Sequence, residues 1–425
     1  MAVPPGARVR TPSGVGLAAV AAGLVCVAAV RDAEWVVHLC LLAALASWSL
    51  LLSGEKVWQG TLHGVVAVIG RLVPSVPWVV RPLVAVSAER RLAAVPALRG
   101  VAVAGLLLAV FGGLFLTADA AFRELLGRLA LPAPGPLLTG RVATWLLVAG
   151  LVGAAATVAA APTAGRAAAS YGGRVLRPVE WVLPLFLLDL LFAAFVTVQL
   201  TVLFGGRDHV LATSGLTYAE YARQGFGQLV AAAVLTLAVV AVCVRVVPRS
   251  AQTDPLLQAL LGVLCVLTLV VLASASRRLG LYEQEFGFTR LRLSVDAAIG
   301  WLALVLVLVL AAGAQKRAGW LPRALVLSAS AGLLVFALAD PDARIAARNA
   351  ERFAATGDLD TTYLASLSLD AVPALQELPE PQRSCVLRAY AGRDTGGWRS
   401  ANLARTRAQQ ALRSARPTDC ALPYR

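Results

Sequence analysis

Charged residues are scarce in this chain, and their scarcity sets the first limit on what the protein can be. Only 15% of its 425 residues are charged and 58% are hydrophobic, whereas a soluble domain carries about 25% charged residues. This composition excludes an ordinary soluble domain. The mean hydropathy of +0.74 indicates an integral membrane protein instead.

Lysine and histidine are rare as well. Lys56 and Lys316 are the only lysines, and the three histidines, His38, His63 and His209, are scattered along the chain. Arginine and alanine in place of lysine are typical of a GC-rich genome, so a single arginine is weak evidence of function. The scattered histidines predict no metal site, no other cofactor and no histidine kinase.

The six cysteines form no C-x-x-C pair. Four lie in hydrophobic runs, where we interpret them as small apolar residues: Cys26, Cys40, Cys243 and Cys265. Cys385 and Cys420 lie in the polar carboxyl-terminal segment. We predict that these two form a disulfide in an oxidising compartment; the alternative is two unrelated thiols.

Signatures of enzymes are missing too. The sequence has no G-x-S-x-G, Walker A, H-E-x-x-H or kinase motif. We therefore predict that the protein is not an enzyme. The enzymatic alternative is a membrane enzyme acting on a lipid-linked substrate, with Glu220 or Glu285 as the base.

Long hydrophobic runs are what the chain has in abundance. A helix crosses the hydrocarbon core with about 17–25 apolar residues, and the runs of this length predict an all-α, polytopic transmembrane helix bundle of about nine spans. The predicted spans are 14–30, 35–52, 101–117, 145–161, 181–204, 225–247, 256–273, 294–314 and 321–338.

The runs divide the chain into three predicted segments. Residues 1–100 hold amino-terminal spans and an interfacial segment, 101–339 form the core bundle, and 340–425 form a small, polar, helical tail. Within the first segment, 65–86 mixes apolar residues with Arg and Pro. This mixture favours an interfacial or re-entrant segment, with a further span as the alternative.

The formal charge of +14 has two possible meanings. Most arginines lie in short loops beside hydrophobic runs, which favours positive loops on the cytoplasmic side over nucleic-acid binding. We predict a multi-pass protein of the plasma membrane with a cytoplasmic amino terminus, an extracytoplasmic tail and the lipid bilayer as its environment. The tail is a possible binding site for an envelope protein, and the sequence sets no oligomeric state.

Asp189 is the strongest anomaly in the predicted spans. It lies about eight residues into 181–204, where a carboxylate costs roughly 2.5–3.5 kcal/mol to insert. Gln199, ten residues on, falls on nearly the same helix face. The pair predicts a proton- or cation-linked site, and the alternative is a carboxyl group that holds helices together or caps backbone bent at Pro184.

A polar stretch, 214–230, leads into the sixth predicted span. Thr217 and Glu220 have the spacing of a capping box, so we expect a helix to begin at Thr217 and to enter the bilayer near Gly225. At about 100° per residue, one face of this helix would carry Tyr218, Tyr221, Gly225, Gln228, Ala232 and Thr236, with Glu220 and Arg223 on another. The polar face predicts a cavity lining; the alternative is an aromatic belt above a packing face.

A similar pattern recurs two spans later. The stretch 280–288 resembles 215–226 and carries a second group of polar residues: Tyr282, Glu285, Arg290 and Arg292. We interpret the two stretches as a degenerate internal repeat whose Tyr, Glu and Arg side chains meet at one extracytoplasmic surface. Chance similarity is the alternative.

Four stretches carry a family resemblance. TYAEYARQGFGQLV (217–230), YEQEFGFTRLRL (282–293), ADPDARIAARNAERF (339–353) and LDTTYLASLSLDAVPAL (359–375) resemble the actinobacterial membrane proteins of domain of unknown function 4153/4173. The resemblance covers most of the chain from about Val101 onward. It implies an integral membrane protein with a polar carboxyl-terminal region, and it carries over no catalytic residues.

Together these patterns predict a protein that binds or moves a small ligand or ion through its helices. Asp189 and Gln199 would act within the membrane, and the two Tyr, Glu and Arg groups at its outer mouth. The alternative is a sensor or scaffold whose tail binds an envelope partner while the spans anchor it.

Overall fold

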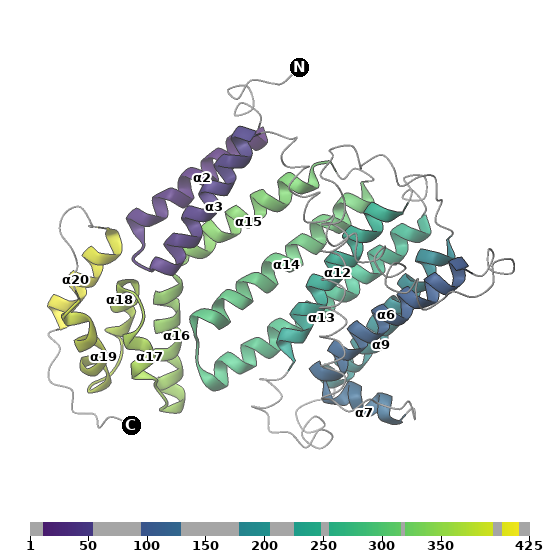
Figure 1. The fold of residues 1–425 in the computed structure, drawn as a ribbon. Coiled ribbons are helices and arrows are strands. Elements are labelled where there is room, and N and C mark those ends of the chain that lie inside the picture. Colours follow the sequence, from purple (N-terminus) through teal and green to yellow (C-terminus); the bar gives the residue numbers. More distant parts are fainter. Residues whose placement is uncertain are drawn as a thin grey trace, which may run out of the picture. The chain divides into compact units, whose positions relative to one another are not determined.

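The computed structural model describes residues 12–53, 95–128, 178–204, 225–247, 255–315, 319–393 and 402–415 (Figure 1). Several predictions concern residues outside these ranges: the interfacial segment 65–86, the span 145–161 and the start of the helix at Thr217.

The described part of the chain is helical and contains no strand, which confirms the predicted all-α transmembrane fold. Among the described residues, six helices are long and apolar enough to cross a membrane: α6 (Val95–Ala118), α9 (Val179–Phe204), α12 (Phe226–Val246), α13 (Pro255–Phe286), α14 (Arg290–Ala314) and α15 (Leu321–Leu338). Two further apolar helices are shorter in their membrane-like part: α2 (Pro12–Val30) and α3 (Glu34–Ser53).

Contacts divide the chain into two compact units. Unit 1 consists of residues 1–58, 280–301 and 319–425, and unit 2 of residues 59–279 and 302–318. Unit 1 thus combines the two ends of the chain with the turn between α13 and α14. The boundaries of these units differ from those of the three predicted segments. The division of the chain into those three segments stays a prediction.

In unit 1, α2 and α3 form a hairpin that packs against α15 (Figure 1). Its contact surface is apolar: Leu24 and Val36 are fully buried beside Ala337 of α15. The helices approach closely at Gly23, where an added Cβ would lie 2.9 Å from a methyl group of Leu334. Small residues allow such close packing between helices in a membrane, where apolar burial alone drives little association.

The tail of unit 1 is a compact group of short helices around its own core (Figure 1). They are α16 (Pro341–Thr356), α17 (Thr361–Ala365), η2 (Leu369–Ala371), α18 (Val372–Leu375), α19 (Gln382–Ala391) and α20 (Leu403–Ala415). The first ones follow capping rules, since Asp340 and Asp360 accept hydrogen bonds at the starts of α16 and α17. Phe288 and Leu293, from outside the tail, also pack on this core.

In unit 2, α6 and α9 are joined by aromatic packing. Phe115 of α6 stacks on Phe195 of α9, with ring centroids 4.0 Å apart. Phe115 also makes an edge contact with Phe192, at 4.9 Å. These rings are fully buried, so aromatic side chains separate Asp189 from Gln199 on the same face of α9.

The start of α12 corrects one prediction. No helix continues through Gly225 into α12, because Gly225 has a φ of +92° and α12 begins at Phe226. Gly225 also lies against the end of α6, where an added Cβ would be 2.1 Å from the carbonyl oxygen of Ala118. A residue in this left-handed conformation interrupts an α-helix.

The end of α13 corrects another. We expected the span to end near Ala273, but α13 continues to Phe286. The recurring stretch 280–285 is therefore the last part of one helix rather than a lead into the next one. The chain turns at Gly287, with a φ of +80°, and α14 begins at Arg290.

Replacing Gly225 with Ala should destabilise the protein by about 1–3 kcal/mol or more, because the substitution adds left-handed strain and a clash with Ala118. The measurement is thermal unfolding of the purified protein in one detergent. Gly227→Ala is the matched control, since Gly227 is helical and nothing lies within 4 Å of an added Cβ. Equal melting temperatures for the two variants would contradict the close approach.

Candidate functional site

Asp189 lies on the buried face of α9. The buried residues of this helix recur mostly at helical spacing: Trp181, Pro184, Leu185, Leu188, Asp189, Phe192, Phe195, Val196, Val198 and Gln199. The side chain is 7% exposed, and neither carboxylate oxygen has a hydrogen-bond partner among the described residues. The carboxylate is therefore buried within unit 2.

Gln199 shares that face but has a different environment. Its amide nitrogen donates to Asp119 Oδ2 at 2.8 Å, and its amide oxygen accepts from Ser274 Oγ at 2.8 Å and from Arg278 Nη2 at 3.0 Å. Every polar atom of its side chain is therefore engaged with other helices. The prediction that Asp189 and Gln199 form one site stays untested, but the hydrogen bonds of Gln199 join it to a separate group.

This group, Asp119, Gln199, Ser274 and Arg278, we call the unit 2 polar cluster. Arg278 forms an ion pair with Asp119, and their side chains are 3% and 0% exposed. Arg278 Nη1 also donates to the carbonyl oxygen of Ala118, at the end of α6, at 2.8 Å. Asp119 Oδ1 in turn accepts from the amide of Phe122 at 3.0 Å, which caps α7 (Ala120–Arg128). The cluster holds helix ends together and leaves no unmatched charge on Asp119.

Most of the first predicted polar group lies outside the described residues: Tyr218, Glu220, Tyr221 and Arg223. Gln228 is described and is half-buried on α12. Thr236, on the same predicted face, is buried, and its hydroxyl lies 3.4 Å from that of Thr268 on α13. This part of the face packs against a neighbouring helix.

The structure brings much of the second group together around the turn between α13 and α14. The guanidinium of Arg292 lies 4.1 Å from the ring centroid of Tyr282. Arg290 donates to both oxygens of Asp342, at 3.0 and 2.5 Å. Glu285 is exposed, and its carbonyl oxygen accepts from Arg352 at 2.6 Å. These contacts join the turn to the tail.

A second set of buried charges lies where the α2–α3 hairpin meets the tail, and we call it the hairpin–tail junction. Arg31 donates to the carbonyl oxygens of Ala337 and Leu338, at 2.9 and 2.5 Å, and forms an ion pair with Asp340. Asp370 Oδ2 accepts from the backbone amides of Asp32 and Ala33, at 2.7 and 2.8 Å, at the start of α3.

The electrostatics of the junction differ from one carboxylate to the next. Burial raises the pKa of Asp340 from 3.8 to about 6, assisted by the nearby charge of Asp370 and opposed by Arg31. Burial also raises the pKa of Asp370. Burial acts in the same direction on Asp342, but hydrogen bonds from Arg290 and Ser368 hold its pKa below the ordinary value.

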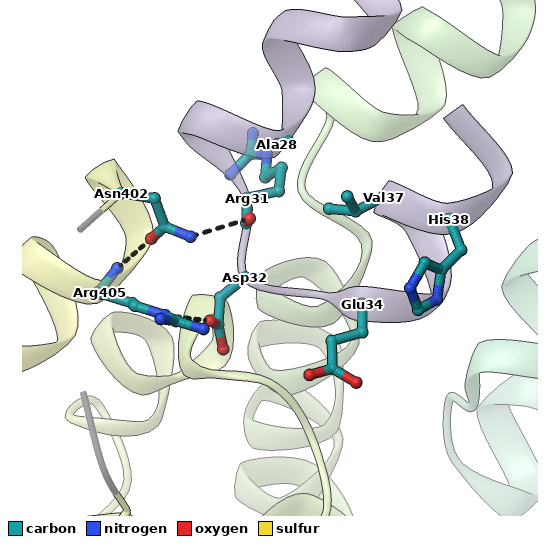
Figure 2. A pocket seen from close by; sticks show the side chains of 8 residues that line it. All are labelled: Ala28, Arg31, Asp32, Glu34, Val37, His38, Asn402 and Arg405. Atoms are coloured by element: carbon teal, nitrogen blue, oxygen red, sulfur yellow. Dashed lines mark hydrogen bonds and ion pairs between the residues drawn. The ribbon is translucent and has the colours of Figure 1, made fainter. Parts of the chain in front are cut away.

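Two cavities adjoin the junction. The first, of about 350 Å³, lies between the hairpin and the start of α20 and is lined by Ala28, Arg31, Asp32, Glu34, Val37, His38, Asn402 and Arg405 (Figure 2). Figure 2 shows Asn402 donating to the carbonyl oxygen of Arg31 at 3.1 Å, and Arg405 to Asp32 Oδ1 at 2.7 Å. The second cavity, of about 420 Å³, includes Trp35, Arg290 and Arg393 in its lining.

Cysteines and metal ligands add little to the candidate sites. Cys385 is disulfide-bonded, whereas Cys420 lies outside the described residues, so their pairing stays a prediction. In the described ranges, no group of three or more His, Cys, Asp and Glu side chains has an arrangement that can hold a metal ion.

Several residues of these clusters were not singled out as site residues from the sequence. Ser274 and Arg278 look ordinary in the sequence because they lie just past the predicted span 256–273, and Asp370 because it lies in the polar tail, where polar residues are common. Arg31 and Asp32 carried a faint signal, as a charged pair between two hydrophobic runs. Their partners lie more than 300 residues away, and no local pattern predicts such contacts.

Comparisons with known proteins yield one match. A family model described as a domain of unknown function, 4153, matches residues 18–378. This match confirms the resemblance predicted from the sequence; the actinobacterial origin stays a prediction. No curated protein and no solved structure matches the chain.

Replacing Arg278 with Met should destabilise unit 2 by about 3–5 kcal/mol, because Asp119 would then be a buried charge without its ion-pair partner. The double variant Asp119→Asn with Arg278→Met should recover part of the loss. Thermal unfolding in detergent measures both. Arg277→Met, which changes an exposed neighbour, is the control; if it lowers stability as much as Arg278→Met, the ion pair has no special role.

Proposed function

The chain belongs to the domain of unknown function 4153 family, and we propose that this member binds and moves a proton or a small cation through its transmembrane helices. Asp189 is the proposed binding group. The proposal is supported by one observation above all: a buried carboxylate on a membrane helix that has no hydrogen-bond partner among the described residues.

An unpaired carboxylate at this depth is costly. Insertion of Asp at the centre of a transmembrane helix costs roughly 2.5–3.5 kcal/mol, and a helix-packing role normally provides a donor that offsets this cost. Thr236 and Thr268 illustrate ordinary packing, because the hydroxyl of Thr268 donates to a backbone carbonyl at 2.7 Å. Asp189 has no such donor in the described residues, which favours a ligand that brings its own positive charge.

The two buried aspartates of unit 2 differ in a way that supports this assignment. Asp119 is neutralised by Arg278, so it offers little attraction to a further cation. Asp189 has no ion pair of this kind among the described residues. A proton or a small cation supplies the missing charge with the least disturbance of the surrounding side chains.

The aromatic packing of α9 favours a small ligand. Phe192 and Phe195 lie between Asp189 and Gln199 on the same buried face, and both are fully buried. A route from Asp189 toward the unit 2 polar cluster passes these rings, so side-chain rotation would have to open it. A proton or a bare ion requires less opening than an organic molecule does.

Orientation and membrane belong to the same proposal. We place the protein in the plasma membrane, with a cytoplasmic amino terminus and an extracytoplasmic tail. The disulfide at Cys385 supports this orientation, because disulfides persist in oxidising compartments and are rare in the cytosol.

A second candidate function is a sensor or scaffold whose tail binds an envelope protein. It is favoured by the folded tail with its own core and by the polar cavities beside it. The tail depends on Phe288, Leu293 and the α2–α3 hairpin for part of its packing, so we expect the binding surface to require the full chain.

Replacing Asp189 with Asn should reduce proton or cation flux at least tenfold, because the amide cannot carry the charge that binds the ligand. The measurement uses the purified protein in proteoliposomes, with an internal pH dye and imposed gradients of H⁺, Na⁺ or K⁺. Glu180→Gln is the matched control, since it removes a carboxylate from the first turn of the same helix. Flux in the Asp189→Asn variant equal to that of the wild type would sink the proposal.

The sensor alternative predicts a different result. Reversing two exposed charges of the tail, Arg348→Glu with Arg388→Glu, should abolish co-purification of an envelope protein with the full-length chain, while Asp189→Asn leaves it intact. Affinity purification from cross-linked membranes measures this. If neither variant changes the captured proteins, the tail surface is not the binding site.

A further inference from the structure

The hairpin–tail junction contains more buried negative charge than its arginines neutralise. Three carboxylates from the tail meet there: Asp340 before α16, Asp342 in α16 and Asp370 in η2. Their side chains are 24%, 0% and 1% exposed. Charges so deeply buried are ordinarily matched one to one by counter-charges or protons.

Two carboxylates of the junction have an arginine of their own. Arg290 donates to both oxygens of Asp342, at 3.0 and 2.5 Å. On the hairpin side, Arg405 donates to Asp32 at 2.7 Å. These arginines are therefore already engaged by Asp342 and Asp32.

Arg31 lies near two carboxylates, those of Asp340 and Asp370. One of its nitrogens, Nη1, is paired with Asp340 Oδ2 and lies 3.7 Å from Asp370 Oδ1. Its other two nitrogens donate to the carbonyl oxygens of Ala337 and Leu338. A single guanidinium nitrogen thus stands between two carboxylate oxygens that carry two negative charges when both are ionised.

The two carboxylate oxygens of Asp370 differ in their hydrogen bonds. Oδ2 accepts three hydrogen bonds, from the amides of Asp32 and Ala33 and from Ser368 Oγ. Oδ1 accepts none among the described residues, although the side chain is only 1% exposed. This oxygen faces the same Arg31 nitrogen as Asp340 does.

We propose that Asp340 and Asp370, on either side of Arg31, form a proton-binding site that takes up one proton and thereby holds the tail against the α2–α3 hairpin. The proton supplies the positive charge that Arg31 cannot give to both carboxylates. When the site is empty, the two aspartates repel each other and the amides of Asp32 and Ala33 lose part of their attachment to Asp370.

The direction of the pH effect follows from the groups that face the site. Burial and the neighbouring Asp370 raise the pKa of Asp340 to about 6, against an ordinary value of 3.8. The closed junction therefore keeps a proton that the open junction, with the tail detached from the hairpin, releases. The equilibrium constant for opening rises roughly tenfold per pH unit as the pH increases between these two pKa values, and it levels off above them. The pKa of Asp342 is lowered, so the contribution of Asp342 to the stability of the junction changes only in more acidic solution.

Hydrogen–deuterium exchange of the full-length protein in nanodiscs, between pH 5 and pH 7.5, tests the site. The readout is the protection factor of peptides covering residues 31–36, whose first amides bind Asp370; protection factors divide out the intrinsic pH dependence of exchange. We expect protection in the wild type to fall about fivefold from pH 5 to pH 6, and about tenfold in all by pH 7.5, where it levels off.

Asp340→Asn should remove this pH dependence, because the pair then carries one negative charge for one arginine. Asn also tolerates the positive φ of 58° at this position and retains an acceptor for Ala343, so this variant keeps the fold. Asp370→Asn should weaken the dependence without removing it, because it takes away the neighbouring charge but leaves the burial that raises the pKa of Asp340. Asp358→Asn is the control: its carboxylate is 80% exposed, and the variant should follow the wild type. Constant protection in the wild type, or a dependence that survives in Asp340→Asn, would overturn the proposal.

Discussion

Arginine side chains that reach the exposed carbonyl groups at the ends of other helices are the interaction on which this structure most depends. The last carbonyl groups of a helix have no partner within it, and they carry the negative end of its dipole. In the described chain, four helices receive an arginine at this end: Arg31 for α15, Arg278 for α6, Arg352 for α13 and Arg393 for α17. Each contact satisfies orphan acceptors and joins two elements at once.

The same arginines determine which carboxylates are matched. Arg278 neutralises Asp119 while it caps α6, so the unit 2 polar cluster is complete in itself. Arg31 caps α15 and faces both Asp340 and Asp370, so the hairpin–tail junction is one positive charge short. Asp189 has no arginine among the described residues. The proposed cation site at Asp189 and the proposed proton site at the hairpin–tail junction both lie where a buried carboxylate lacks a full counter-charge among the described residues.

The residue patterns predicted the helices well and their polar contacts poorly. Apolar runs long enough to cross a bilayer locate α6, α9 and α14 closely, because every backbone group in lipid must be bonded within its own segment. The prediction failed at Gly225 and at the end of α13. There, the conformation depends on a neighbouring helix end or on the tail, neither of which is visible in the local sequence.

Asp189 and Gln199 show, within one helix, the same difference between what the sequence predicts and what it does not. Their shared buried face follows from spacing along α9 and was predictable. Their hydrogen bonds were not predictable. Gln199 bonds to Asp119 and Arg278, whereas Asp189 has no hydrogen-bond partner among the described residues. This difference depends on which side chains of other helices lie beside each residue of α9.

The sequence by itself determined that this is a helical membrane protein, since hydrophobic length and backbone hydrogen bonding leave a chain of this composition no other way to cross a bilayer. The tertiary structure alone decided which charges are paired. Arg31 meets Asp340 across more than 300 residues, and a pair so distant in the chain forms only when folding brings their elements together. The physical reason is that a carboxylate's protonation and ligand binding depend on the charges within a few ångströms of it, and three-dimensional packing sets those neighbours.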